Sequence, residues 1–286
     1  MLTAALAGLA AGGTYALLGV CAVFTYRLVA VVNFAGAAVG AVGTFAMVML
    51  HQAGMPLVPA VAIGLLAGTI ASGLVGAVMS TWFAESDAQT KAAVTVAMLV
   101  GLIFAGLRVT GGQHPRQVPA LFPGAAFSLD NVVVTVAAVV TIALAIAFAI
   151  GATLFLNRTR VGLLLRALSE HPMTAELMGI RTRLLSAAIW LVTGAATSLA
   201  LMIVAPEWEP NFMTLSELIV PAFAAALMGS FRSFWLTVVG GIGLGLLEGM
   251  ASNLAWLSQY RGGLPFVIIV AVLLWGQRGA RWDEAR

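Results

Sequence analysis

Long apolar stretches, interrupted by short polar breaks, make up most of this chain. Residues 1–26, 28–84, 131–157 and 184–206 contain no Asp, Glu, Lys or Arg. About 20 apolar residues are enough for a helix to cross a bilayer. The alternation over about ten residues that marks a membrane β-strand is absent from the sequence. Because helices satisfy their own backbone groups in lipid, the pattern predicts an all-α, polytopic membrane helical bundle.

Nine spans are predicted, and breaks rich in Gly, Pro and polar residues separate them. The segment at 218–230 is short for a crossing and is expected to be a broken or re-entrant helix, so eight or nine transmembrane helices fit the sequence. The whole chain, 1–286, is expected to form a single transmembrane domain. The spans are placed at 3–25, 30–50, 57–81, 92–107, 131–156, 184–205, 218–230, 235–257 and 264–276.

Composition supports this class, because 61% of the residues are hydrophobic, only 9% are charged and the mean hydropathy is +1.04. Soluble domains carry about 25% charged residues. Cys21 is the one cysteine, which excludes an intramolecular disulfide and a metal site of paired cysteines. The first charge, Arg27, follows the first apolar run instead of preceding it, so we expect a retained span and not a cleaved signal.

The basic residues indicate the orientation in the membrane, because Lys and Arg collect in cytoplasmic loops. One side receives Arg27, Lys91, Arg232, a loop at 157–183 and a tail at 277–286. The other side receives Arg108, Arg116, Arg261 and the acidic residues Glu207, Glu209 and Glu217. With nine spans, the N-terminus is predicted outside and the C-terminus in the cytoplasm. The net charge of +3 then reflects these loops, and nucleic acid is not an expected partner.

Small residues recur every fourth position in three segments, which places a smooth stripe on one face of each helix. Such stripes allow two helices to approach closely. Packing within the chain is the first interpretation, and an interface between subunits is the alternative. The stripes are Ala4, Gly8, Gly12 and Ala16; Gly64, Gly68, Ser72, Gly76 and Ser80; and Gly241, Gly245 and Gly249.

Catalytic and nucleotide-binding motifs are missing from the sequence. His51, His114 and His171 lie far apart and lack the spacing of a zinc site. A P-loop needs Gly-Lys-Ser/Thr, whereas Lys91 stands between Thr90 and Ala92. We therefore expect no enzyme, no metal and no cofactor in this chain, and any ATPase on another polypeptide.

Four polar residues within apolar spans are candidates for a translocation pathway: Thr14, Tyr15, Asn33 and Glu248. Ionisable residues inside a membrane commonly mark such pathways. For Glu248 the alternatives are a buried structural carboxylate and a helix end nearer to the surface.

The loop at 157–183 contains a short predicted helix between Pro172 and Gly179. Pro favours the first helical position and Gly the end. Two turns are too short to be stable alone, which favours a protrusion that docks into a partner's groove. The alternative is an interfacial loop whose arginines bind lipid headgroups. The predicted coupling residues are Pro172, Met173, Ala175, Glu176, Leu177, Met178 and Gly179.

Three sets of motifs resemble the permease subunits of branched-chain amino acid type (LivH/LivM-like) ABC importers, in order along nearly the whole chain. The first set is Gly13-Thr-Tyr-Ala-Leu-Leu18 followed by Val32-Asn-Phe-Ala35. The second, Thr159-Arg-Val-Gly-Leu-Leu-Leu-Arg-Ala167 with Ala175-Glu-Leu-Met-Gly-Ile180, resembles that family's loop with the coupling helix. The third runs from Ala222-Phe through Ala226-Leu-Met-Gly-Ser230 to Gly240-Gly-Ile-Gly-Leu-Gly245 and Glu248.

Two departures from the family's pattern bear on function. After Asn33-Phe-Ala35 the family commonly continues with His-Gly-Glu, whereas this chain has Gly36-Ala37-Ala38, which puts amino-acid specificity in doubt. Where the family tends to a Gly-Ser-x-x-Gly turn, this chain has Ser230-Phe-Arg-Ser-Phe234, so a differently packed turn is expected.

The resemblance implies an importer permease in the inner membrane of a bacterium. Its implied partners are a second homologous permease, in a heterodimer rather than a homodimer, two ABC ATPase subunits that hold ATP and Mg, and an extracytoplasmic binding protein. The substrate would be a branched-chain amino acid or a related amide, urea or carboxylate. Glu207, Glu209 and Glu217 are the candidate docking residues for the binding protein. A passive channel or a secondary carrier is the alternative function.

Overall fold

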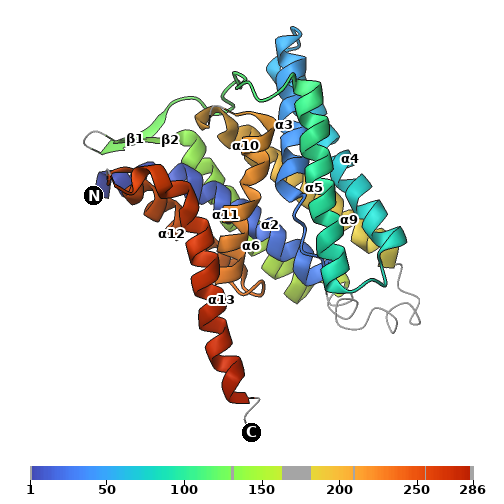
Figure 1. Ribbon diagram of the computed structural model, residues 1–286. Helices are drawn as coiled ribbons and strands as arrows, with labels where there is room; N and C mark the ends of the chain where they lie inside the picture. Colours follow the sequence, from blue (N-terminus) through green and yellow to red (C-terminus); the bar gives the residue numbers. More distant parts are fainter. Residues whose placement is uncertain (1, 130–131, 163–181, 209, 255, 284–286) are drawn as a thin grey trace.

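Helices dominate the part of the chain that the structure describes, residues 2–129, 132–162, 182–208, 210–254 and 256–283 of a computed structural model (Figure 1). The first half contains α1 (Leu2–Ala7), α2 (Leu9–Val29), α3 (Gly36–Gln52), α4 (Leu57–Trp82), α5 (Ala88–Thr110) and α6 (Val136–Arg158). The second half contains α9 (Thr182–Val204), η1 (Ala205–Glu207), α10 (Phe212–Glu217), α11 (Ile219–Met228), α12 (Phe234–Ser252), η2 (Ser258–Gly263) and α13 (Leu264–Asp283).

The predicted bundle is confirmed, with seven helices long and apolar enough to span a membrane among the described residues. Two shorter apolar segments, Gly36–Gln52 and Phe212–Met228, match the remaining predicted spans. The second is broken at Leu218 into α10 and α11, as its length suggested. It begins six residues before the predicted start at 218, because the Asn211 side chain accepts from the Thr214 amide and caps the helix there.

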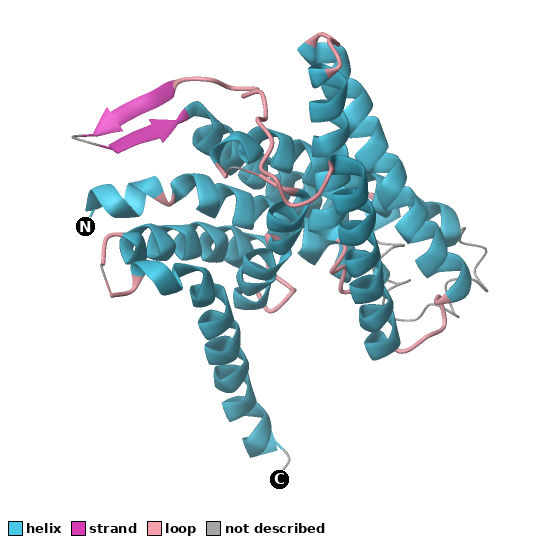
Figure 2. Cartoon of the chain, turned by 45° about the horizontal axis from the view of Figure 1, so that its top comes forward, coloured by secondary structure: helices cyan, strands magenta, loops and turns pink. Residues whose placement is uncertain are grey.

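A β-hairpin is the one element type that the sequence pattern did not predict. Strand β1 (Ala125–Leu129) pairs antiparallel with β2 (Val132–Thr135), and the pair projects from the bundle in Figure 2. The sequence pattern instead predicts that residues 132–135 belong to the start of the span at 131–156. The run of three valines and a threonine has high strand propensity, but it continues directly into the apolar sequence of α6, so the pattern read as a single helix.

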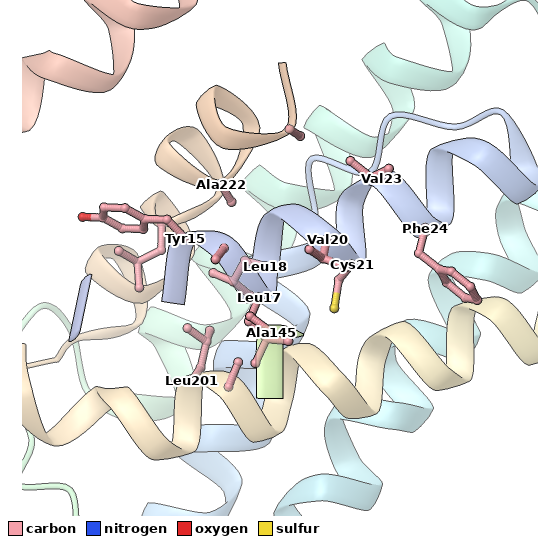
Figure 3. Packing of buried hydrophobic residues seen from close by; sticks show 14 of the residues in the cluster. Tyr15, Leu17, Leu18, Val20, Cys21, Val23, Phe24, Ala145, Leu201 and Ala222 are labelled. Atoms are coloured by element: carbon pink, nitrogen blue, oxygen red, sulfur yellow. The ribbon is translucent and has the colours of Figure 1, made fainter. Parts of the chain in front are cut away.

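Helix α2 lies at the centre of the molecule and is buried along most of its length. It packs against α12, α6, α11 and α9. Figure 3 shows Leu17, Leu18 and Cys21 of α2 close to Ala145 of α6, Leu201 of α9 and Ala222 of α11. Cys21 is a buried free thiol within this packing.

The first and third small-residue stripes face each other and form the contact between α2 and α12, which we call the seam. A Cβ at Gly245 would overlap the backbone of Gly8 and Gly12, and one at Gly241 would overlap Ala16. A Cβ at Gly249 would overlap the carbonyl of Ala4 at the end of the seam. Residue numbers rise on one helix as they fall on the other, so the two helices are antiparallel. The interpretation of these stripes as packing within the chain is confirmed.

The second stripe packs α4 against α9 and α3. A Cβ at Gly68 would overlap Ser198, and one at Gly76 would overlap the fully buried ring of Trp190. The Ser72 hydroxyl donates to the carbonyl of Trp190 at 2.5 Å. Small residues therefore bring backbone to backbone in both halves of the bundle, where van der Waals contact and hydrogen bonds supply what lipid does not.

The loops lie at the two ends of the bundle, which correspond to the two sides of the membrane to which the basic residues are assigned. At the end assigned to the cytoplasm, Arg27 lies over the ring of Phe234 at 5.1 Å. At the opposite end, the Arg116 guanidinium donates to Gln52, and the Arg116 amide donates to the carbonyl of Pro210 at 3.0 Å. Helix α13 continues to Asp283, so part of the predicted tail at 277–286 is helical.

Candidate functional site

Two of the four predicted pathway residues, Tyr15 and Glu248, form a hydrogen bond, although 233 positions separate them in the sequence. The Tyr15 hydroxyl donates to Oε2 of Glu248 at 2.7 Å. Tyr15 is buried with only 2% of its surface exposed, whereas Glu248 is half-buried. The structure thus places a carboxylate of α12 and a phenol of α2 in contact beside the seam.

The seam explains why these side chains meet. Gly12 and Ala16 of α2 bracket Tyr15 and contact Gly245 and Gly241 of α12, so the backbones are close enough for a tyrosine to reach across. The Tyr15 ring also lies 6.4 Å from the ring of Trp208, centroid to centroid. Arg261 of η2 is near enough to interact electrostatically with both Tyr15 and Glu248. Sequence reasoning missed Trp208, because a tryptophan next to an exposed loop gives no signal of its partner.

Thr14 is buried but directs its hydroxyl to its own helix. Its Oγ1 donates to the carbonyl of Ala10 at 3.0 Å, and the residue has no exposed surface. A threonine that bonds back to position i−4 satisfies its hydrogen within the helix. Thr14 therefore does not join the pair formed by its neighbour Tyr15.

Asn33 lies in a separate place, beside a small cavity among α2, α3, α4 and α9. Its Oδ1 is buried and has no hydrogen-bond partner among the described residues. The cavity volume is about 10 Å³, and its polar lining comprises Asn33, Thr25, Ser72, Thr193 and Thr197. The four hydroxyls donate to backbone carbonyls, so their hydrogens are already satisfied. A space of this size, with the unpartnered Oδ1 of Asn33 beside it, has room for about one water molecule.

The segment with Asn33 is held by Thr95 of α5, a residue that the sequence did not single out. The Thr95 hydroxyl donates to the carbonyl of Val32 at 2.9 Å, and the Phe34 amide donates to the Thr95 hydroxyl oxygen at 3.4 Å. Because of this irregular stretch, α3 begins at Gly36, whereas the sequence pattern predicts a span that starts at residue 30. Ala30 at its start has a φ of 54° and ends α2.

Two of the motifs behind the family resemblance contact each other. The rings of Phe34 and Phe223 are edge to face with centroids 4.7 Å apart, and Phe223 also contacts Phe231 at 5.9 Å. Phe231 belongs to the departing turn, where Ser230 and Phe231 both have a φ of 51°. Glycine adopts this backbone conformation far more readily. At this turn an aromatic side chain, that of Phe231, therefore packs onto the motif residue Phe223.

The remaining predicted residues are dispersed or undescribed. The coupling residues Pro172, Met173, Ala175, Glu176, Leu177, Met178 and Gly179 lie outside the described residues, as does Glu209. Glu207 is exposed in η1, and its Oε1 accepts from the hydroxyl of Thr135 at 2.5 Å, at the base of the hairpin. Glu217 is exposed at the end of α10. Within the described ranges, no group of three His, Cys, Asp or Glu side chains could hold a metal ion.

Taken together, the spans, the seam and the polar groups between helices define a multi-pass membrane protein. The chain belongs to the family described as "Branched-chain amino acid transport system / permease component", whose model matches residues 4–273. It is therefore a permease component of an ABC transport system in the inner membrane, as the resemblance implied.

Curated relatives agree over almost the full length. The chain is 24% identical to the high-affinity branched-chain amino acid transport system permease protein BraD of Pseudomonas aeruginosa, over 95% of this chain and 92% of that protein. It is 26% identical to LivH of Escherichia coli (strain K12), over 93% and 91%. It is 25% identical to a probable LivH of Methanocaldococcus jannaschii, over 92% and 87%. Among solved structures, it is similar to PsaBC from Streptococcus pneumoniae in complex with Fab, with a TM-score of 0.48, 11% identity and coverage of 95% and 88%.

Proposed function

We propose that this chain is one membrane subunit of an ATP-driven importer for branched-chain amino acids or a related small solute, such as an amide, urea or a carboxylate. Membership of the permease family is the observation that carries the proposal. ATP and Mg would be held by two separate ATPase subunits, because the sequence lacks a P-loop of its own. An extracytoplasmic binding protein would deliver the substrate.

The position of the described end of α6 supports transmission of energy from the cytoplasmic side. Phe24 contacts both Phe155, near the end of α6, and Phe234, at the start of α12. The end of α6 therefore lies with Arg27 and Phe234 at the cytoplasmic end of the bundle. The segment between α6 and α9 would contact an ATPase on this side, and the motion of the ATPase would tilt these helices as rigid bodies.

The exposed apolar helices support a second permease subunit. In the most apolar stretch of α5 only 11% of the residues are buried within the chain, and in that of the last span, Ser258–Gln277, only 6% are. On α13, Leu274 and Trp275 are 60% and 75% exposed. A homologous subunit in a heterodimer would cover part of this surface and leave the rest to lipid.

Substrate would pass near the polar groups of the two candidate places, the Tyr15–Glu248 pair and the region of Asn33. Polar groups buried among apolar spans are concentrated where a solute or an ion must be received. We further propose that the binding protein docks at the acidic surface that includes Glu207, Glu209 and Glu217. Lysine substitutions at these three positions should weaken capture of the binding protein at low salt, and unchanged capture would disprove that docking site.

A charge-reversing variant in the predicted coupling helix tests the main proposal. In the complete transporter reconstituted into vesicles, Glu176→Lys combined with Leu177→Asp should abolish ATP-driven uptake of labelled leucine while membrane insertion stays intact. Glu85→Lys, an exposed reversal in another cytoplasmic loop, is the matched control and should transport normally. Unchanged ATP-driven uptake by the double variant would refute the coupling assignment. Uptake by the unmodified transporter without internal ATP would favour a channel or carrier.

A further inference from the structure

An apolar groove lies between α6 and α9, next to the cytoplasmic part of α2. Its volume is about 640 Å³. Phe24 of α2 lies at its base, and the lining from α6 and α9 includes the small residues Ala147, Gly151 and Ala188. A Cβ at Gly151 would meet nothing within 4 Å. The groove is therefore open where larger side chains would have closed it.

The length of the groove along α6 corresponds to the thickness of one leaflet of a bilayer. On α6 its lining runs from Leu144 to Phe155. At 1.5 Å per residue this stretch is about 17 Å long. Half of the hydrocarbon core of a bilayer is about 15 Å thick. A groove of this length that starts at the cytoplasmic end of α6 reaches to about the middle of the membrane.

Positive charge lies at the cytoplasmic mouth of the groove. Val161 is a lining residue, and its neighbour Arg160 is exposed, as is Arg158 at the end of α6. Phe155, the last α6 residue of the lining, is one helical turn before Arg158. Guanidinium groups bind phosphate well, often through two parallel hydrogen bonds.

We propose that this groove is a binding site for an anionic phospholipid of the cytoplasmic leaflet. One acyl chain fills the groove between α6 and α9, and the phosphate binds Arg158 and Arg160. The length of the groove, its apolar lining and the charge at one end match the two parts of such a lipid.

Native mass spectrometry of the full-length protein, titrated with phosphatidylglycerol or phosphatidylcholine, tests the site. An arginine near an anionic headgroup contributes roughly fivefold in affinity, so two should give about a thirtyfold preference for phosphatidylglycerol. Arg158→Gln with Arg160→Gln should remove the preference, whereas Arg232→Gln, at another exposed cytoplasmic arginine, should retain it. Equal binding of both lipids by the unaltered protein would overturn the proposal.

Filling the groove tests the position of the acyl chain. Gly151→Leu should eliminate the tight phosphatidylglycerol adduct, while Gly101→Leu, at an equally open glycine of α5, should not. Ala188→Leu closes the same groove from α9 and serves if the first variant does not fold. Full binding by a folded groove-filled variant would contradict the inference. So would cross-linking of a second permease subunit to Gly151→Cys in the assembled transporter, because that subunit would then be the occupant.

Discussion

Small residues line both the seam between α2 and α12 and the groove between α6 and α9, but with opposite results. At the seam, Gly8, Gly12 and Gly245 bring two backbones into direct contact. In the groove, Gly151 leaves open space. Glycine therefore either allows two helices to touch or leaves a space beside its own helix, and the outcome depends on which residues face it.

The spacing of small residues distinguishes the two cases. On the seam they repeat every fourth position on both helices, so each stripe presents a continuous smooth face to the other. Gly151 instead has the large residues Phe148, Leu154 and Phe155 nearby on α6. An isolated glycine between large side chains leaves a local gap in the helix surface. A repeated stripe makes an interface, and only the interface holds Tyr15 against Glu248.

The largest expected effect is at Gly245, where a side chain would break the seam. Gly245→Val places carbon atoms on the backbone of Gly8 and Gly12. Overpacking of this kind costs about 3 kcal/mol. The melting temperature of the purified protein in detergent should fall by several degrees. Gly243→Val, on the same helix but with nothing within 4 Å of its Cβ position, is the control. Equal stability of the two variants would show that the seam does not hold the helices together.

A smaller effect is expected for the hydrogen bond that the seam positions. Tyr15→Phe removes the donor to Glu248 and should lower the free energy of unfolding by about 1–3 kcal/mol, because the carboxylate loses a charge-assisted partner. A double-mutant cycle with Glu248→Leu should give a coupling energy of about 1–2 kcal/mol. Tyr26→Phe, at a half-exposed tyrosine of the same helix, controls for loss of a hydroxyl. Additive effects of Tyr15→Phe and Glu248→Leu would exclude a direct interaction.

The contrast between neighbouring residues shows how far the sequence could predict the site. Thr14 and Tyr15 are adjacent polar residues in one apolar span and give the same signal, yet Thr14 bonds to its own helix and Tyr15 reaches α12. Polarity in an apolar span identifies Glu248 as unusual, but its partner depends on how two antiparallel stripes align. The stripes themselves, and the broken segment near Leu218, followed from spacing and length.

The hairpin and its contact with Glu207 were not predictable in the same way. Val132–Thr135 continues an apolar run, so hydrophobicity alone gives no boundary between strand and helix. Pairing with β1 decides the conformation, and that pairing joins short segments with weak individual signals. The bond between Thr135 and Glu207 then joins residues 72 positions apart. Contacts of this range depend on the assembled bundle.

The smallest expected effect, at Gly151, separates the groove most sharply from the seam. Gly151→Ala adds a Cβ to open space and improves helix propensity, so the free energy of unfolding should rise by roughly 0.5–1 kcal/mol. Gly12→Ala places the same methyl group 3.0 Å from Cα of Ile242 in the seam and should instead destabilise the protein. Denaturation of both variants in the same detergent measures the difference. If both lose equal stability, the groove is closed in the folded protein and α6 packs on α9 as tightly as α2 packs on α12. If only Gly12→Ala is destabilised, the space beside Gly151 is free to receive an acyl chain.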